Sequence, residues 1–389
     1  MPMTAALQGR RDYAGPALLA DGVRPFFLAA GVWGALTILF WLPLSMGTLT
    51  VDSVFSPADW QIHEMLYGYA AAAMAGVLLT AIPNRTGRLP VAGWPLGVLA
   101  LLWFTGRVAM LASGKIGGLA AAAIDVGFLL TLAALVAHEM IAGKDWRNWR
   151  VLAVLGVLIV GNVVFHAEVR LNGTGDYGIR IALGTVVMSI VLVGGRAVQS
   201  FTNAWLIRSL VPFSRVDAAA LAVTVLALIG WIAVPAQTLT GALMVVAGVL
   251  QAVRLARWAG DRTPADPLKL VLHAGYAFVP LGFVLIGAST WFAAVPASAG
   301  IDAWTGGAIG LMTLAMMTRA TLGHTGQPLQ AGAATRMIYI CIVAAALLRI
   351  VASFTGSTIV LEYAGMAWIA GFSCFVLLYG SLLATHKPA

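Results

Sequence analysis

Four of the six histidines lie beside residue types that take part in metal or redox chemistry. His63 precedes an acidic residue, and His166 closes an apolar run. His273 lies near the start of another apolar run, and His324 follows a methionine-rich segment that contains Met316. Imidazole nitrogen and thioether sulfur are ligands for copper and for haem iron, although methionine at helical spacing is more often packing material. The candidate metal and cofactor ligands are therefore His63, His166, His273, His324 and Met316.

Charged residues within or at the ends of apolar runs are costly and usually functional. Glu64 adjoins His63, Asp125 lies inside the run 117–141, and Arg319 ends the methionine-rich segment. Asp125 suits either a proton path or a polar link between helices, and the sequence leaves both interpretations open. Glu64, Asp125 and Arg319 are the candidate catalytic residues.

The composition around these residues is that of a membrane protein. Hydrophobic residues make up 60% of the 389 residues and charged residues only 10%, and the mean hydropathy is +0.91. In a soluble domain about a quarter of the residues are charged. A membrane-spanning helix needs about 20 mostly apolar residues, and twelve such runs are predicted, at about 25–45, 60–82, 93–112, 117–141, 151–168, 181–199, 216–234, 237–256, 268–290, 300–318, 335–352 and 359–384. These runs are too long for outer-membrane strands, so we expect an all-α polytopic fold with about twelve transmembrane helices.

The positive charges predict how the spans are oriented. With a cytoplasmic N-terminus, most of the 23 Lys and Arg residues collect on the cytoplasmic side. The exceptions are Arg107, Lys115, Arg170, Arg180 and Arg349. This bias agrees with the positive-inside rule. We therefore expect both termini in the cytoplasm, and the net charge of +8 follows from topology rather than from nucleic-acid binding.

Domain organisation follows from the same span count. The predicted parts are a cytoplasmic N-terminal segment at 1–24, a twelve-helix transmembrane domain at 25–384 and a cytoplasmic tail at 385–389. The sequence contains no Walker A loop and no dinucleotide fingerprint, so the chemistry is expected within the helices. Spans two, six and ten end in similar short arginine-containing segments, a pattern that hints at three four-helix units. The expected partner is the lipid bilayer, and no nucleic acid is expected.

The predicted orientation sorts the histidines into two groups. His63 and His166 fall on the non-cytoplasmic side at similar depth, whereas His273 and His324 fall toward the cytoplasmic side, near Met316. Two histidines from different helices at one depth suit a bis-imidazole haem or a histidine-rich copper site. The sequence does not reveal which helices are neighbours. Each histidine pair is therefore expected only because its two members lie on the same side of the membrane at similar depth.

Five segments carry a family resemblance that extends over nearly the whole chain. They are Arg24-Pro25-Phe26-Phe27, His63-Glu64-Met65-Leu66-Tyr67-Gly68, Pro83-Asn84-Arg85-Thr86-Gly87, His273-Ala274-Gly275-Tyr276, and Met312-Thr313-Leu314-Ala315 with His324-Thr325-Gly326. With these segments the chain resembles the NnrS family of bacterial inner-membrane proteins. The resemblance implies a twelve-helix protein that contains haem, expected to be b-type, and copper. It also implies a link to the nitric oxide response and to nitrosative stress in denitrifying and host-associated bacteria.

The family pattern marks particular residues of this chain. Those that match are His63, Glu64, His273, Arg319 and His324, and also His166. One position departs from the pattern, because the family often has Trp-His-x-His-Glu where this chain has Trp60-Gln61-Ile62-His63-Glu64. The missing imidazole at Gln61 removes a ligand from any copper site that would use it, whereas a haem held by His63 would survive the change.

Three kinds of function compete. The first is an oxidoreductase resembling nitric oxide reductase, in which a haem or second metal binds nitric oxide, acids such as Glu64 and Asp125 handle protons, and a quinol or another donor supplies electrons. The second is non-catalytic, haem-based nitric oxide binding, sensing or electron transfer. The third is transport of a metal, haem or nitrosyl-iron species, which inverted repeats and broken spans would favour; we find no convincing case of either in the sequence.

Overall fold

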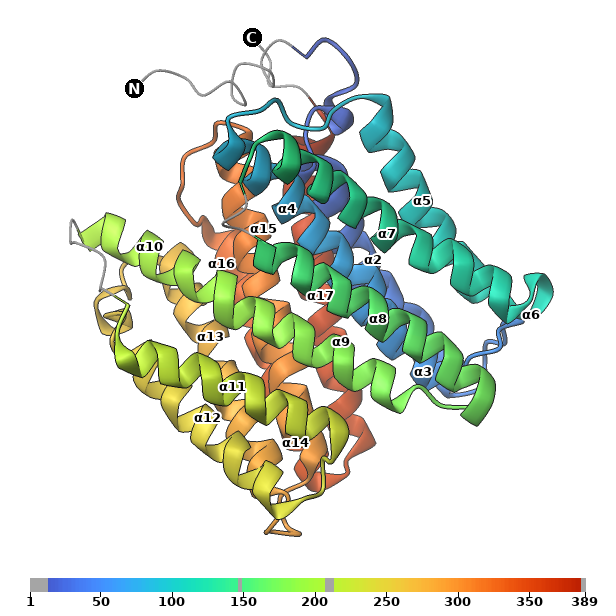
Figure 1. Cartoon of the computed structure of the whole chain (residues 1–389), viewed down its shortest axis with the longest axis vertical. Helices are drawn as coiled ribbons and strands as arrows, with labels where there is room; N and C mark the ends of the chain where they lie inside the picture. Colours follow the sequence, from blue (N-terminus) through green and yellow to red (C-terminus); the bar gives the residue numbers. More distant parts are fainter. Residues whose placement is uncertain (1–12, 146–148, 207–212, 386–389) are drawn as a thin grey trace. The chain divides into compact units, whose positions relative to one another are not determined.

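The computed structural model describes residues 13–145, 149–206 and 213–385, and its regular structure is helical, with no strand among these residues (Figure 1). This confirms the predicted all-α fold. The predicted N-terminal segment and C-terminal tail lie partly outside the described residues.

Eleven helices among the described residues are long and apolar enough to cross a membrane. They are Val23–Ser45 (α2), Pro57–Thr86 (α3, η2 and α4), Trp94–Leu111 (α5), Gly118–Ala142 (α7), Trp149–Asn172 (α8), Asp176–Ala204 (α9, η4 and most of α10), Arg215–Ala233 (α11), Thr238–Ala256 (α12), Pro267–Ala288 (α13), Ala333–Thr355 (α16) and Thr358–Ala384 (α17). The protein is therefore a multi-pass membrane protein.

The remaining predicted span, 300–318, is also helical. It runs through α14 (Ala297–Asp302), the π-helical turn η6 (Ala303–Ile309) and α15 (Gly310–His324). Its residues include many Gly, Ala and Thr, so it is less apolar than the other spans although most of its side chains are buried. Small residues of this kind allow close packing between helices in a membrane.

Three predicted spans contain a π-helical turn. These turns are η2 (Glu64–Ala70), η4 (Ile190–Gly194) and η6, and they fall in the second, sixth and tenth predicted spans. A π turn places one more residue between hydrogen-bonded groups than an α turn does, and such turns are frequent at functional sites. In span two the turn begins at Glu64, directly after His63.

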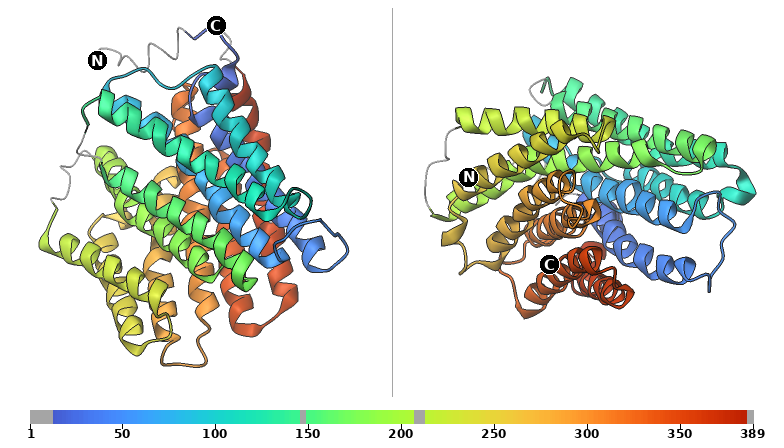
Figure 2. Two further views of the ribbon diagram at one scale, coloured as in Figure 1. Left: turned by 45° about the vertical axis from the view of Figure 1, so that its right-hand side comes forward. Right: turned by 90° about the horizontal axis from the view of Figure 1, so that it is seen from below.

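The chain divides into two compact units by its internal contacts. Unit 1 comprises Met1–Ala182, Ala320–Gln327 and Phe375–Ala389, and unit 2 comprises Leu183–Arg319 and Pro328–Cys374. Within unit 1, α5 packs along α7, α2 along α4, and α7 along α8 (Figure 2). Within unit 2, α12 packs against both α11 and α13.

Span two begins at a well-defined helix cap. The hydroxyl of Ser56 accepts a hydrogen bond from the Asp59 backbone N–H at 3.0 Å, and Pro57 occupies the first turn, as is favourable at a helix N-terminus. The helix then buries His63 and Glu64 completely. Its following turns are rich in alanine, which lets α2 and α7 pack closely against α4.

The crossing of α8 and α9 depends on Gly178. A Cβ at this position would lie 2.4 Å from the Cα of Phe165, so only glycine fits. The Gly178 N–H donates to Glu168 at 2.8 Å, and the Tyr67 hydroxyl donates to the Gly178 carbonyl at 2.9 Å. These contacts fix the end of α8 that carries His166.

Candidate metal centre

His63 lies at the centre of a polar cluster in unit 1, and its side chain is fully buried. Its Nε2 lies 3.1 Å from Asp125 Oδ2 and 3.1 Å from Asn162 Oδ1, and its Nδ1 lies 3.2 Å from Glu64 Oε1. The ring of His63 thus lies between two carboxylates and an amide oxygen, groups that accept hydrogen bonds from an imidazole N–H. His63 therefore connects span two to both α7 and α8.

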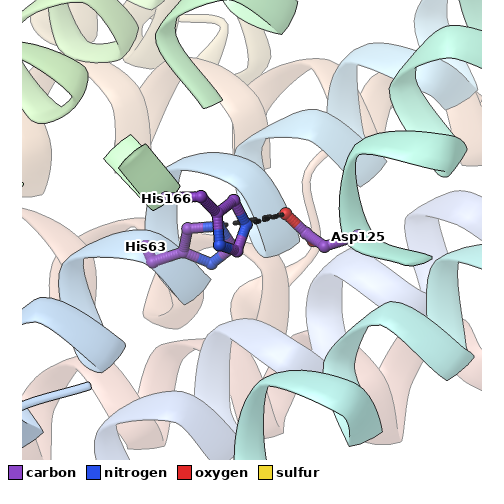
Figure 3. A group of neighbouring side chains, drawn as sticks. All are labelled: His63, Asp125 and His166. Atoms are coloured by element: carbon purple, nitrogen blue, oxygen red, sulfur yellow. Dashed lines mark hydrogen bonds and ion pairs between the residues drawn. The ribbon is translucent and has the colours of Figure 1, made fainter. Parts of the chain in front are cut away.

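His166 approaches the same carboxylate from α8 (Figure 3). Its Nε2 lies 3.1 Å from Asp125 Oδ2, the atom that also faces His63. Asn162, four residues earlier on α8, donates from Nδ2 to this oxygen at 2.7 Å. Residues four apart share one face of a helix, so α8 presents both side chains to α7.

Arg107 on α5 is the buried cation of the cluster, with only 1% of its side chain exposed. Its guanidinium donates to Glu64 Oε1 at 2.9 Å and also to Asp125 Oδ1. A buried charge is tolerated only when it is paired and hydrogen-bonded. Here both carboxylates pair with the guanidinium, and the ring of His63 lies against both of them.

Gly68, within the π turn, leaves room for the two donors to Glu64. Trp33 on α2 donates from Nε1 to Glu64 Oε2 at 2.6 Å, opposite the bond from Arg107. A Cβ on Gly68 would lie 2.9 Å from the Arg107 guanidinium and 2.9 Å from Trp33 Nε1. A side chain at Gly68 would therefore displace the groups that hold Glu64.

Aromatic rings pack against the imidazoles of the cluster. The ring centroids of Tyr67 and Phe165 each lie 4.9 Å from that of His63. The Phe55 ring centroid lies 5.6 Å from that of His166. Such apolar surroundings exclude water and strengthen the charged contacts between the polar groups.

A family model described as NnrS protein matches residues 17–387, nearly the whole chain. The chain belongs to the NnrS family. The membership confirms the resemblance found in the sequence and links the protein to a family of the nitric oxide response. A comparison with the curated proteins finds no match.

The cluster in this NnrS protein offers three ligands to a metal ion. One ligand atom each from His63, Asp125 and His166 lies within 4.8 Å of the other two. Two imidazoles and a carboxylate suit copper, zinc or non-haem iron. Ligating histidines commonly donate their second ring N–H to a carboxylate, as His63 does to Glu64. The donor set therefore fits a single transition-metal ion, which would replace the proton on each Nε2.

A haem held between His63 and His166 does not fit this NnrS site. Their ring centroids are 5.3 Å apart with the planes at 67°, and both Nε2 atoms meet at one oxygen of Asp125. Phe165 packs against both imidazoles. A porphyrin is a flat ring system much wider than an imidazole and needs an open slot between its axial ligands, so the arrangement suits a small ion.

The other two candidate histidines of the NnrS chain lie in different compact units. In unit 2, His273 on α13 lies 2.9 Å from the Thr202 hydroxyl through Nε2, and its buried Nδ1 has no hydrogen-bond partner among the described residues. In unit 1, His324 at the end of α15 has its Nδ1 3.1 Å from Asp21 Oδ2. The pairing of His273 with His324 stays a prediction.

Met316 and Arg319 both lie on the part of α15 that belongs to unit 2. Met316 is half-buried. The Arg319 guanidinium lies 3.9 Å from the ring centroid of Phe201, within the range of a cation–π contact. The three-ligand group contains neither residue, and their roles as ligand and catalytic residue stay predictions.

Three residues of the NnrS cluster, Arg107, Asn162 and Trp33, are not among the candidates predicted from the sequence. Arg107 lies inside the predicted span 93–112, and an arginine within a span is a functional signal in itself. Asn162 precedes His166 by one helical turn, so the helical period could have pointed to it. No feature of the sequence distinguishes Trp33 from the other tryptophans.

Proposed function

We propose that this protein binds a copper ion through His63, Asp125 and His166 and acts in nitric oxide metabolism in the bacterial inner membrane. The observation that carries the proposal is the convergence of these three ligands within 4.8 Å inside a membrane protein of the NnrS family. Among the divalent first-row metals, copper binds nitrogen and oxygen ligands most tightly. The family resemblance favours copper on separate grounds.

The reaction that suits this site best is the reduction of nitric oxide. Two molecules of nitric oxide, two electrons and two protons yield one nitrous oxide and one water. A bound copper ion would supply a one-electron redox centre and a place for nitric oxide to bind. The protons and the electrostatic environment come from the chain itself.

Each residue of the cluster has a defined role in this proposal. Asp125 is held as a ligand by Arg107 and by the Asn162 amide. Glu64 lies 3.2 Å from His63 Nδ1, within reach for proton transfer. Glu64, which accepts from Arg107 and Trp33, is thus placed to orient the ring of His63 and to receive a proton from it, while the aromatic rings around His63 keep water out.

A b-type haem is the second cofactor of the proposal, at a place other than the His63–His166 pair. His273 and His324, which lie in different compact units, are each a predicted axial ligand for such a haem. The buried Nδ1 of His273 has no hydrogen-bond partner among the described residues, but Gly260 packs against it, where a Cβ would lie 2.6 Å away. The support for His273 as a haem ligand is therefore the family resemblance. Full haem occupancy after His273→Ala or His324→Ala would rule out the substituted residue as an essential axial ligand.

Metal analysis and spectroscopy on the full-length protein in detergent test the metal centre. We expect about one copper ion per chain, since the three donors define one site, and nitrous oxide on anaerobic addition of nitric oxide with a reductant. His63→Gln and His166→Gln should lose the copper. His138→Gln is the control, because His138 is exposed near the end of α7 and lies outside the cluster.

The outcomes separate the competing functions. Wild-type protein that takes up no copper would contradict the metal centre. Copper that responds spectrally to nitric oxide without release of nitrous oxide would contradict the reductase and favour non-catalytic binding or sensing. A colourless protein without haem or copper would favour transport.

A further inference from the structure

A cleft of about 770 Å³ lies beside the metal centre in unit 1. Side chains from α7, from α8 and from the segment before α3 line it, among them Phe55, Val126 and Val163. The only lining residues with polar side chains are His166 and Arg170. This volume is typical of sites for organic ligands, which are mostly apolar with a few polar groups.

The rim of the cleft is apolar and exposed. Leu119, Val163 and Leu171 expose 65%, 50% and 80% of their surface, and all three lie on helices long and apolar enough to span a membrane. Large apolar side chains on the outer face of a spanning helix are suited to contact with lipid chains. A ligand of this cleft would therefore enter from the lipid phase and be apolar over most of its surface.

His166 provides a polar side chain to the lining of the cleft. Its Nε2 is taken by Asp125, and no hydrogen bond of its Nδ1 is found among the described residues. In the metal-free neutral ring Nδ1 accepts a hydrogen bond, whereas a metal on Nε2 would leave the proton on Nδ1 as a donor. A hydroxyl both donates and accepts, so it can pair with His166 in either state.

We propose that this cleft binds the head group of a membrane quinol, with a ring hydroxyl hydrogen-bonded to Nδ1 of His166. A quinol combines an apolar tail and ring with the hydroxyl that this imidazole can engage. A plain acyl chain would leave Nδ1 unpaired. A haem carries two carboxylates, whereas the lining offers one permanent cation, Arg170.

Quinol binding rests on the proposed function only in naming the electron donor, since the binding contacts themselves require no metal. The test measures equilibrium binding of radiolabelled decylubiquinol to the full-length protein in lipid nanodiscs under anaerobic conditions. Ala123→Trp fills the cleft, because Ala123 is one of its exposed lining residues. Ala134→Trp is the matched control, because Ala134 is exposed on the same helix outside the lining.

We expect Ala123→Trp to weaken decylubiquinol binding at least about tenfold by occupying the ligand's volume, and Ala134→Trp to leave it unchanged. His166→Phe keeps an apolar ring but removes the hydrogen bond, which should weaken binding by about tenfold. Competition with decanol should be weak, because decanol has the hydroxyl and tail but lacks the aromatic ring.

Several results would overturn quinol binding at this place. Equal affinities of the wild type and Ala123→Trp would exclude the cleft, and effective competition by decanol would assign it to an alkyl chain. Loss of haem absorbance in Ala123→Trp would assign it to haem. Two results separate quinol binding from the metal centre. Quinol binding to protein produced without copper supports the cleft as a quinol site even if the metal centre fails. Copper uptake by protein that does not bind quinol contradicts the quinol site alone.

Discussion

Arg107 donates to both Glu64 and Asp125 at a place where the side chains are at most 1% exposed. Each carboxylate has further neutral donors, Trp33 for Glu64 and Asn162 for Asp125. Neutral donors do not cancel charge, so the guanidinium is what makes two buried carboxylates tolerable in this helix bundle. The network therefore supports the stability of the helix bundle as well as the geometry of the candidate metal centre.

Removing this cation should destabilise the protein strongly. We expect Arg107→Gln to lower the free energy of unfolding by about 3–5 kcal/mol, because it leaves two buried carboxylates short of a positive charge. Denaturant titration of the purified protein in detergent measures the change. Arg88→Gln is the control, since Arg88 pairs with Glu139 at 2.8 Å but is 41% exposed, and it should cost less than about 1 kcal/mol. Similar effects of the two substitutions would contradict the buried network.

The sequence allowed part of this cluster to be predicted at the residue scale. His63, Glu64, Asp125 and His166 are unusual residues for apolar runs and can be singled out one by one. Their convergence on a single carboxylate oxygen depends on which helices are neighbours, and hydropathy carries no information on that. The exclusion of a haem from the His63–His166 pair likewise depends on ring positions, which only the structure provides.

Helix positions were predictable from apolar runs, but helix ends and π turns were not. The predicted span 151–168 corresponds to Trp149–Asn172, and the predicted span 60–82 corresponds to Pro57–Thr86. Apolar runs mark the part of a helix in the hydrocarbon core, whereas the helix itself continues until a cap or turn ends it. The π turn that begins at Glu64 has no known signature in residue type, so it could not be foreseen from the sequence.

Gly178 offers a test of how helices α8 and α9 cross. Gly178→Ala places a methyl group against the backbone of Phe165, so we expect a loss of about 1–3 kcal/mol in unfolding free energy and reduced copper content through displacement of His166. Gly156→Ala on α8 is the control, because a Cβ there meets no atom within 4 Å, and it should be neutral or stabilise by up to about 1 kcal/mol. Thermal unfolding and metal analysis measure both. A stable, fully loaded Gly178→Ala protein would argue against this crossing.

For the whole molecule, the even number of helical runs and the distribution of Lys and Arg predict both termini in the cytoplasm. A green fluorescent protein fused to the C-terminus should therefore fluoresce, and alkaline phosphatase fused there should be inactive. Fusions after Thr50, in the segment between the first two spans, should give the opposite pair of results. Active phosphatase at the C-terminus would mean that a span was miscounted or that the orientation is reversed.

The enclosure of the metal centre has a consequence for how the ion gets there. Phe55 lies against His63 and His166, with ring centroids 6.3 Å and 5.6 Å away, and it also lines the cleft beside them, so we expect its ring to slow the exchange of an ion between the candidate site and the cleft. Loss of copper to an external chelator should then be slow in the wild type and at least about tenfold faster in Phe55→Ala. Phe354→Ala is the control, because Phe354 is 47% exposed on α16, and it should not change the rate of copper loss. Equal rates in all three proteins would show that the ion exchanges freely. Slow exchange would mean that the cell has to deliver the metal while the chain is being inserted, and that the supply of copper during synthesis sets how much of the protein becomes active.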